Sequence, residues 1–235
     1  MFHVEQRSSL SSLLEQCSQE IGVPLRPEQV KQLLVHFDQL KTWSQSINLT
    51  SIRDDQEIIV KHFIDSLACF SVESIKKEAW LLDVGTGAGF PGIPLKIVRD
   101  DLHVTLVEPV KKKASFLLSV IGILRLKQIS VFCGTLRQFI VQSKPFHQFD
   151  YIVTRALKPD EIFEQGERLL ANHGKIILYL AKPFNQLAYP KWVLTAERQF
   201  DLPMKFGRRV LSILERSPKK EAQVSSTWNR DRFVL

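Results

Sequence analysis

The stretch LLDVGTGAGFPG, residues 81–92, constrains the fold more than any other part of the chain. An apolar run ends at Asp83, a glycine-rich turn follows, and an apolar segment with helical spacing begins after it. The turn has glycine at every second position, namely Gly85, Gly87 and Gly89. Side chains there would keep a ligand away from the backbone, and glycine also permits a positive φ. The order of strand, glycine turn and helix is typical of a nucleotide-like ligand held at the carboxyl end of a parallel strand.

A second acid points to a ligand that contains a ribose. The next strand-like run, HVTLVEP, carries Glu108 near its end, roughly 20 residues beyond the glycine turn. A carboxylate at that distance can accept hydrogen bonds from both ribose hydroxyls. The glycine turn and Glu108 together predict an adenosine-containing ligand.

Two glycine patterns compete for this stretch. Gly87, Gly89 and Gly92 fit the dinucleotide-binding pattern, but Gly92 then lies inside the expected helix, beside Pro91. Read from the strand end, the motif is D-x-G-x-G-x-G, which resembles the first motif of S-adenosylmethionine-dependent methyltransferases. A phosphate-binding loop is excluded, because Ile93 stands where that loop requires a lysine. A nicotinamide-dependent oxidoreductase and a glycine turn without any ligand stay open as alternatives.

Apolar runs and turn residues after residue 80 alternate in a regular way. Strands are predicted at 81–84, 103–108, 129–133, 149–154 and 175–181, and helices at about 91–99, 111–124, 135–142 and 160–171. This alternation predicts an α/β protein with a doubly wound, mostly parallel sheet covered by helices on both faces. The rest of the chain is expected to hold one further helical piece and a last antiparallel edge strand at Val210–Leu214.

Two apolar stripes at helical spacing precede the first strand. One runs from Leu10 to Ile21 and the other begins near Pro27 and extends to Trp43. We therefore expect residues 1–75 to form an N-terminal helical cap packed on the core. Residues 76–235 are expected to form one Rossmann-like domain.

Charge, apolar runs and cysteine spacing indicate which binding partners and which cellular location to expect. The formal net charge is +7 and the pI is near 9.4, a balance that favours polyanions such as nucleic acid. No apolar run approaches the roughly 18 residues of a membrane span, and the start of the chain does not resemble a secretory signal. Cys17, Cys69 and Cys133 lie far apart and show no metal-binding spacing. We expect a cytoplasmic monomer with no membrane partner and no metal.

Five separated stretches of the chain resemble the bacterial GidB/RsmG family. They are INLTSI (47–52), HFIDSL (62–67), LLDVGTGAGFPGIPL (81–95), LVEPVKKKASFL (106–117) and FDYIVTRAL (149–157). The proline after GAGF, the NLT segment and the TRAL strand end are not general features of methyltransferases. The family methylates N7 of a guanine in small-subunit (16S) ribosomal RNA. The resemblance implies a seven-stranded class I methyltransferase sheet, S-adenosyl-L-methionine as cofactor, and ribosomal RNA or the small ribosomal subunit as partner.

The resemblance also assigns site residues. It implies that Gly85 and Phe90 line the cofactor site and that Arg155 lies at its mouth, with a core phenylalanine as the alternative for Phe90. Related sequences usually carry an acid near Arg137, so the backbone N–H groups of Leu136 and Arg137 are expected to meet the adenine instead. The complete predicted cofactor-binding set is Asp83, Gly85, Gly87, Gly89, Phe90, Glu108, Leu136, Arg137 and Arg155.

No catalytic side chain is predicted. N7 of guanine carries a lone pair and no proton, so catalysis reduces to holding nucleophile, methyl and sulfur in line. A methylase that removes a proton would need a general base. His62 and Asp65 share a helical face, either at the pocket rim or as a local polar pair. RNA binding is expected from basic residues, namely Lys111, Lys112, Lys113, Arg208, Arg209, Arg216, Lys219 and Lys220. A non-catalytic RNA-binding module is the remaining alternative.

Overall fold

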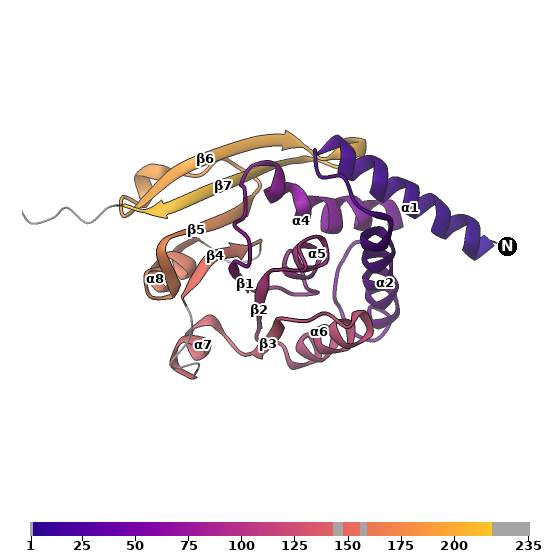
Figure 1. Cartoon of the computed structure of the whole chain (residues 1–235), viewed down its shortest axis with the longest axis horizontal. Helices are drawn as coiled ribbons and strands as arrows, with labels where there is room; N and C mark the ends of the chain where they lie inside the picture. Colours follow the sequence, from indigo (N-terminus) through magenta and orange to yellow (C-terminus); the bar gives the residue numbers. More distant parts are fainter. Residues whose placement is uncertain (1, 143–147, 156–158, 218–235) are drawn as a thin grey trace, which may run out of the picture.

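A seven-stranded sheet in the order β3-β2-β1-β4-β5-β7-β6 forms the centre of the molecule (Figure 1). The computed structural model describes residues 2–142, 148–155 and 159–217. The strands are β1 (Trp80–Val84), β2 (His103–Glu108), β3 (Ile129–Cys133), β4 (Phe149–Thr154), β5 (Leu170–Leu180), β6 (Trp192–Asp201) and β7 (Arg208–Arg216). Strands β1 to β5 pair in parallel, whereas β7 is antiparallel to both β5 and β6. This confirms the predicted doubly wound, mostly parallel sheet.

Both faces of the sheet are covered, as continuous apolar strands require. Leu81 and Leu82 on β1 are fully buried and point to opposite faces, because side chains alternate along a strand. Leu81 belongs to a core cluster that includes the apolar residues of α5 (Gly92–Val98) and α6 (Lys111–Leu124). Leu82 belongs to a second cluster with residues of α7 (Leu136–Gln142) and α8 (Pro159–Leu169). All four helices lie within a few residues of the predicted ranges.

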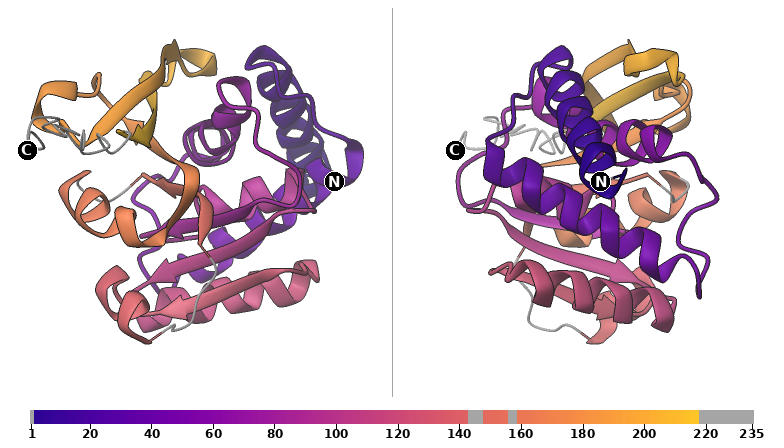
Figure 2. Two further views of the ribbon diagram at one scale, coloured as in Figure 1. Left: turned by 60° about the vertical axis from the view of Figure 1, so that its left-hand side comes forward. Right: turned by 90° about the vertical axis from the view of Figure 1, so that its right-hand side faces the viewer.

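The N-terminal part is helical, as predicted, and shares the first of these cores. Its elements are α1 (Phe2–Glu20), α2 (Pro27–Trp43), α3 (Asp55–Ile58), the π-helical turn η1 (Ile59–Ile64), α4 (Asp65–Leu67) and the 3-10 turn η2 (Ala68–Ser71). Helix α2 packs on α5 and α6, and α1 packs on α2 and η1. In both views of Figure 2 the indigo N-terminal helices lie against the body formed by the magenta elements. No helix in the described residues is both long and apolar enough to cross a membrane.

The last quarter of the chain differs from the prediction in two ways. Up to residue 217, where the described part of the chain ends, the expected helical piece is represented only by the short 3-10 turns η3 (Gln186–Ala188) and η4 (Pro203–Lys205), and β6 was not predicted. Strand β7 is antiparallel as expected, but it lies inside the sheet between β5 and β6. Burial explains the omission, because β6 exposes most of its residues as an edge strand whereas β7 buries five in succession.

The topology fixes where a ligand should bind. The order of the strands reverses between β1 and β4, so the loops after these strands diverge to opposite faces. In open α/β sheets, ligands bind in the crevice at the carboxyl ends of the strands at this switch point. The glycine turn follows β1 directly and therefore lies at that crevice.

Candidate functional site

The glycine turn has the backbone conformation that its sequence predicts. Gly85, Gly87 and Gly89 have φ values of +71°, +61° and +88°, which other residues rarely adopt. A Cβ on Gly89 would lie 2.5 Å from Cδ1 of Ile93, so the turn is tightly packed toward α5. A Cβ on Gly87 would meet nothing within 4 Å, so the turn is open at this residue. An open backbone at the end of β1 fits the close approach of a nucleoside ligand.

Asp83 lies beneath the turn and holds it in shape. The side chain is fully buried, and its Oδ2 accepts hydrogen bonds from Thr86 Oγ1 at 2.6 Å and from the Gly92 amide at 2.8 Å. One carboxylate oxygen therefore joins β1, the turn and the start of α5. Its Oδ1 is buried and has no hydrogen-bond partner among the described residues. Burial raises the pKa of Asp83 to about 7, against the lowering effect of the bonds from Thr86 and Gly92.

Glu108 faces the turn from the end of β2. Its Oε2 accepts a hydrogen bond from the Gly87 amide at 2.9 Å, and its Oε1 accepts one from the Val110 amide at 2.9 Å. Each carboxylate oxygen can accept a further bond. The acid is thus fixed beside the open part of the turn, where the sequence places a ribose.

Phe90 is packed between two imidazole rings. His36 and His62 each stack on it, with ring centroids 4.9 Å away and an interplanar angle of 17° in both pairs. Phe63 meets its edge at 5.0 Å. The ring is 7% exposed, so the alternative of a core phenylalanine describes its surroundings well. Its contact with a cofactor stays a prediction.

The two histidines are neutral near pH 7. His36 Nε2 lies 2.9 Å from the Ala88 carbonyl oxygen, and His62 Nε2 lies 2.8 Å from Thr50 Oγ1. Burial lowers the pKa of His36 to about 4, although the bond to Ala88 opposes this. Burial, and then the positive charge of Arg155, lowers the pKa of His62 to about 3. His36 was missed by the sequence analysis, where the only signal was a polar residue within the apolar part of a helix.

Arg155 is turned toward the π-helical turn η1 rather than projecting freely. Its Nη2 donates to the Lys61 carbonyl at 2.8 Å and lies 3.1 Å from Asp65 Oδ2. Its Nη1 lies 3.3 Å from the His62 carbonyl and 3.3 Å from Ser66 Oγ. The residue follows β4 at the switch point, as predicted, and 18% of its side chain is exposed.

Asp65 joins two arginines from distant parts of the chain. Its Oδ2 contacts both Arg155 and Arg209 Nε, the latter at 3.3 Å, and the side chain is 1% exposed. His62 and Asp65 therefore face different partners, and the described hydrogen bonds and ion pairs include none between them. Arg209, which was predicted to contact RNA, uses its Nε to bind Asp65.

The start of α7 lies next to Glu108. The Gly134 amide donates to the Glu108 carbonyl at 3.0 Å, which brings the loop after β3 beside the acid. Leu136 is buried and Arg137 is exposed at the first positions of the helix. The first amides of a helix have no partner within it. The predicted use of the Leu136 and Arg137 amides is compatible with this position and stays a prediction.

The predicted basic residues have different surroundings. Lys111 and Lys112 are exposed at the start of α6, immediately after the strand that carries Glu108. Arg216 donates to the Ala171 carbonyl at 2.9 Å, and Arg208 pairs with Asp201. Lys113 is half-buried, and Lys219 and Lys220 lie outside the described residues. Of the predicted set, Lys111 and Lys112 are best placed to meet a phosphate near the crevice.

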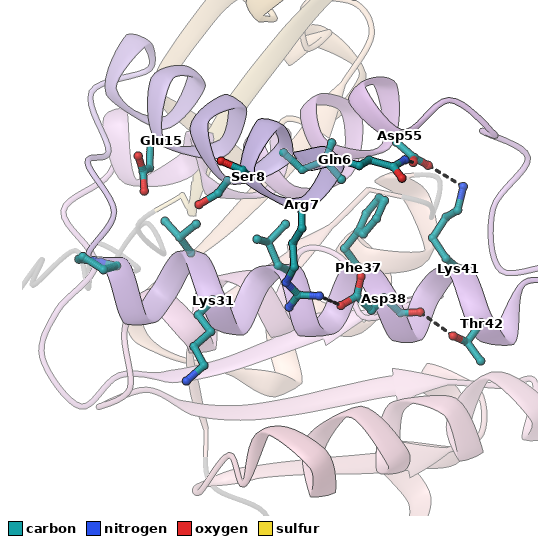
Figure 3. Close-up of a pocket in the computed structure, with 15 residues that line it drawn as sticks. Gln6, Arg7, Ser8, Glu15, Lys31, Phe37, Asp38, Lys41, Thr42 and Asp55 are labelled. Carbon is teal, nitrogen blue, oxygen red and sulfur yellow. Dashed lines mark hydrogen bonds and ion pairs between the residues drawn. The ribbon is translucent and has the colours of Figure 1, made fainter. Parts of the chain in front are cut away.

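A separate groove of about 830 Å³ lies between α1 and α2 (Figure 3). Four of its charged residues form two ion pairs, Arg7 with Asp38 and Lys41 with Asp55. None of the predicted cofactor-binding residues lines it. The candidate site therefore stays the predicted one at the switch point, where the glycine turn and Glu108 meet. The described residues contain no group of three His, Cys, Asp or Glu side chains that could hold a metal ion.

Comparison with known families gives a match across most of the chain. The family model GidB, which is described as rRNA small subunit methyltransferase G, matches residues 29–210. The chain belongs to the GidB family. The match spans most of α2 to the start of β7 and so includes every predicted cofactor-binding residue and His36.

Curated GidB relatives align over the central part of the chain. Ribosomal RNA small subunit methyltransferase G of Alkaliphilus oremlandii is 38% identical over 149 residues, which cover 63% of this chain and 62% of the relative. The protein of the same name from Roseiflexus castenholzii is 42% identical over 138 residues, which cover 58% of each. The chain thus spans about three fifths of the length of these relatives.

Solved structures support the fold of this GidB member. MtNAS in complex with MTA and tNA superposes with a TM-score of 0.51 at 16% identity and covers 88% of this chain and 71% of that chain. TrmN from Thermus thermophilus gives a TM-score of 0.51 at 14% identity and covers 77% of this chain and 52% of that one. At such identities the likeness shows the Rossmann-like fold alone.

Proposed function

We propose that this chain transfers a methyl group from S-adenosyl-L-methionine to N7 of a guanine in small-subunit ribosomal RNA, as one step of rRNA processing. The GidB family match supports the reaction class. The observation that carries the proposal is the Gly87 amide bound to the Glu108 carboxylate at 2.9 Å, at the switch point of the sheet. This pairing sets an open backbone and a fixed acid side by side.

The residues at the crevice fit an adenosine-containing cofactor. The turn at Gly87 leaves room at the backbone, and Glu108 retains acceptor capacity for ribose hydroxyls. The first amides of α7, at Leu136 and Arg137, would meet the adenine edge. When bound, S-adenosylmethionine supplies an electrophilic methyl group on a sulfonium, which is a good leaving group.

The chain's own residues act by positioning. N7 of guanine has no proton to lose, so no general base is required. The two buried histidines near the turn agree with this. His36 is bonded to the Ala88 carbonyl and His62 to Thr50, and burial lowers both pKa values well below neutrality. We therefore assign the rate enhancement to alignment of the guanine with the methyl group.

The substrate side of the crevice is basic. Lys111 and Lys112 are exposed directly after β2, and Arg155 lies at the end of β4. Contacts of these residues with RNA phosphates would weaken binding as salt rises, with a log–log slope of roughly −0.7 to −0.9 per contact. A cytoplasmic location and action as a monomer are part of the same proposal.

Transfer of labelled methyl groups to modified RNA tests the acceptor atom. Small-subunit ribosomal RNA is transcribed with guanosine or with 7-deazaguanosine, which has carbon in place of N7. We expect label in the first RNA and none in the second. Equal labelling of both RNAs would rule out N7 as the acceptor. Ribosomal small subunits serve as a parallel substrate in case the naked transcript is not recognised.

A further inference from the structure

Helix α2 is hydrogen-bonded through two buried polar side chains to the segment formed by the glycine turn and α5. Gln29 and His36 lie on one face of α2, because positions seven apart on a helix are nearly eclipsed. Gln29 Nε2 donates to the Val98 carbonyl at 2.9 Å, at the last residue of α5. His36 Nε2 lies 2.9 Å from the Ala88 carbonyl, in the glycine turn before α5. Helix α2 is therefore bonded to the backbone at both ends of the segment that carries the turn.

The proton on His36 has a defined position. A carbonyl oxygen only accepts, so the nitrogen that faces Ala88 must carry the proton. The other nitrogen, Nδ1, is buried and has no hydrogen-bond partner among the described residues. The residue is fully buried, with its ring stacked on Phe90. His36 is therefore a neutral donor with one bond, and that bond ends on the turn.

Three consecutive residues of the turn are each held by a different element. Thr86 is bonded to Asp83 of β1, and Gly87 is bonded to Glu108 of β2. The third is Ala88, whose carbonyl is bonded to α2. The first two anchors come from the sheet itself.

The third anchor is the one that the N-terminal helices add. Ala88 lies between Gly87 and Gly89, which both have a positive φ. Glycine loses more conformational freedom on folding than any other residue, so the backbone on both sides of Ala88 is costly to hold in one conformation. A buried carbonyl that loses its donor is also costly, so the turn would shift to find another.

We propose that His36 is a positioning residue that fixes the glycine turn for cofactor binding through its hydrogen bond to the Ala88 carbonyl. This inference rests on the proposed function only in taking the ligand of the turn to be S-adenosylmethionine. It assigns the N-terminal helix α2 a part in cofactor affinity, beyond the packing of its apolar stripe.

Two variants at one position separate the donor from the ring. His36→Gln can place an amide N–H near the position of Nε2, whereas His36→Phe keeps a ring to stack on Phe90 and removes the donor. Binding of S-adenosylhomocysteine is measured by calorimetry on the full chain. We expect His36→Phe to weaken binding about tenfold, a factor within the cost of leaving a buried acceptor without its donor. His36→Gln should bind within about threefold of the wild type.

A histidine away from the turn serves as the control. His103 stacks on Trp80 at the amino ends of β1 and β2, whereas the turn lies at the carboxyl end of β1. His103→Phe should leave cofactor binding unchanged. In methyl transfer assays, His36→Phe should raise the KM for S-adenosylmethionine and leave the KM for RNA within about twofold. A general loss of packing would not affect the KM for the cofactor selectively.

The outcomes distinguish this inference from the proposed function. If the wild type does not bind S-adenosylhomocysteine, the proposed function fails. If the wild type binds and His36→Phe binds with the same affinity, the proposed role of the His36 donor is wrong. The same conclusion follows if His36→Gln and His36→Phe lose the same factor in affinity. If His36→Phe does not fold, His36→Asn replaces it as the variant without the donor. The shorter Asn side chain places its amide nearer the position of Nδ1, which does not face the Ala88 carbonyl. Asn binding as tightly as Gln would then overturn the inference.

Discussion

Arg155 donates to the backbone carbonyl of Lys61 at 2.8 Å, across 94 residues of chain. The bond ties the end of β4 to the π-helical turn η1, and Arg155 also contacts Asp65 and the His62 carbonyl there. π-Helical turns occur often at functional sites. The arginine that the sequence predicts at the site mouth is therefore also the residue that holds this turn against the sheet.

Replacing Arg155 should reduce both activity and stability. Arg155→Ala removes the donor to the Lys61 carbonyl and leaves Arg209 as the remaining arginine on Asp65. We expect a loss of roughly 1–3 kcal/mol in the free energy of unfolding, because buried acceptors lose their donor. Denaturant unfolding and methyl transfer are measured on the same sample. Arg155→Lys keeps the charge without the planar fork and should recover little activity. Turnover near that of the wild type in Arg155→Ala would remove this residue from the site.

Glu108→Gln should weaken cofactor binding with little effect on the chemical step. The amide oxygen can accept from one of the two amides that the carboxylate now serves, at Gly87 and Val110. The other amide would face an NH₂ group. We expect the KM for S-adenosylmethionine to rise by about tenfold or more, while kcat changes less than threefold, because losing a hydrogen bond to a charged group costs roughly 1.5–3 kcal/mol.

A second glutamate provides a control away from the crevice. Oε2 of Glu197, on β6, accepts bonds from the Phe184 amide at 2.9 Å and from Ser212 Oγ of β7 at 2.8 Å. Glu197 is exposed, so Glu197→Gln makes the same chemical change at a carboxylate outside the crevice and should leave the KM for S-adenosylmethionine unchanged. An equal rise in KM for both variants would show that Glu108 acts through stability alone.

Acidification from about pH 6 to pH 4.5 should destabilise the protein. The pKa values of His36 and His62 fall from 6.5 to about 4 and about 3 on folding, so both take up protons on unfolding in this range. The pKa of Asp83 rises from 3.8 to about 7, so Asp83 releases a proton on unfolding and opposes the effect. The net uptake is one proton, which gives a slope of about 1.4 kcal/mol per pH unit.

Removing the opposing acid should steepen this dependence. Asp83→Asn leaves both histidines to titrate, and the slope should approach about 2.7 kcal/mol per pH unit. Unfolding by urea at a series of pH values measures both slopes. A free energy of unfolding that is constant or increases on acidification would contradict the neutral, buried state of the two rings.

Thermal unfolding with added ligands separates a methyltransferase from an oxidoreductase. A ligand at 100 times its Kd stabilises the folded state by about 2.7 kcal/mol, so the true ligand raises the melting temperature. We expect S-adenosylhomocysteine to raise it and NAD to have no effect. A rise with NAD alone would favour the oxidoreductase.

The features that the sequence predicts well depend on local chemistry. Continuous apolar runs such as the one that contains Leu81 and Leu82 indicate buried parallel strands, and the alternate glycines permit the positive φ values that Gly85 and Gly89 adopt. The end of β1 and the position of Glu108 beside it then follow from the order of the elements.

The features that escaped prediction depend on contacts between distant segments. Nothing near His36 in the sequence indicates a carbonyl acceptor at Ala88, 52 residues away. Arg209 was predicted to contact RNA from its charge alone, but β7 places it next to Asp65. Strand β6 was missed because its residues are mostly exposed and carry little apolar periodicity.

The most direct measurement is mass spectrometry of nucleosides from small-subunit ribosomal RNA after incubation of the protein with ribosomal particles and isotope-labelled S-adenosylmethionine. We predict a single labelled nucleoside, 7-methylguanosine, which forms about fivefold or more slowly when Glu108→Gln is used at a cofactor concentration near the wild-type KM. Label in any other nucleoside, or no label in RNA although the protein binds the cofactor, would contradict the proposed reaction.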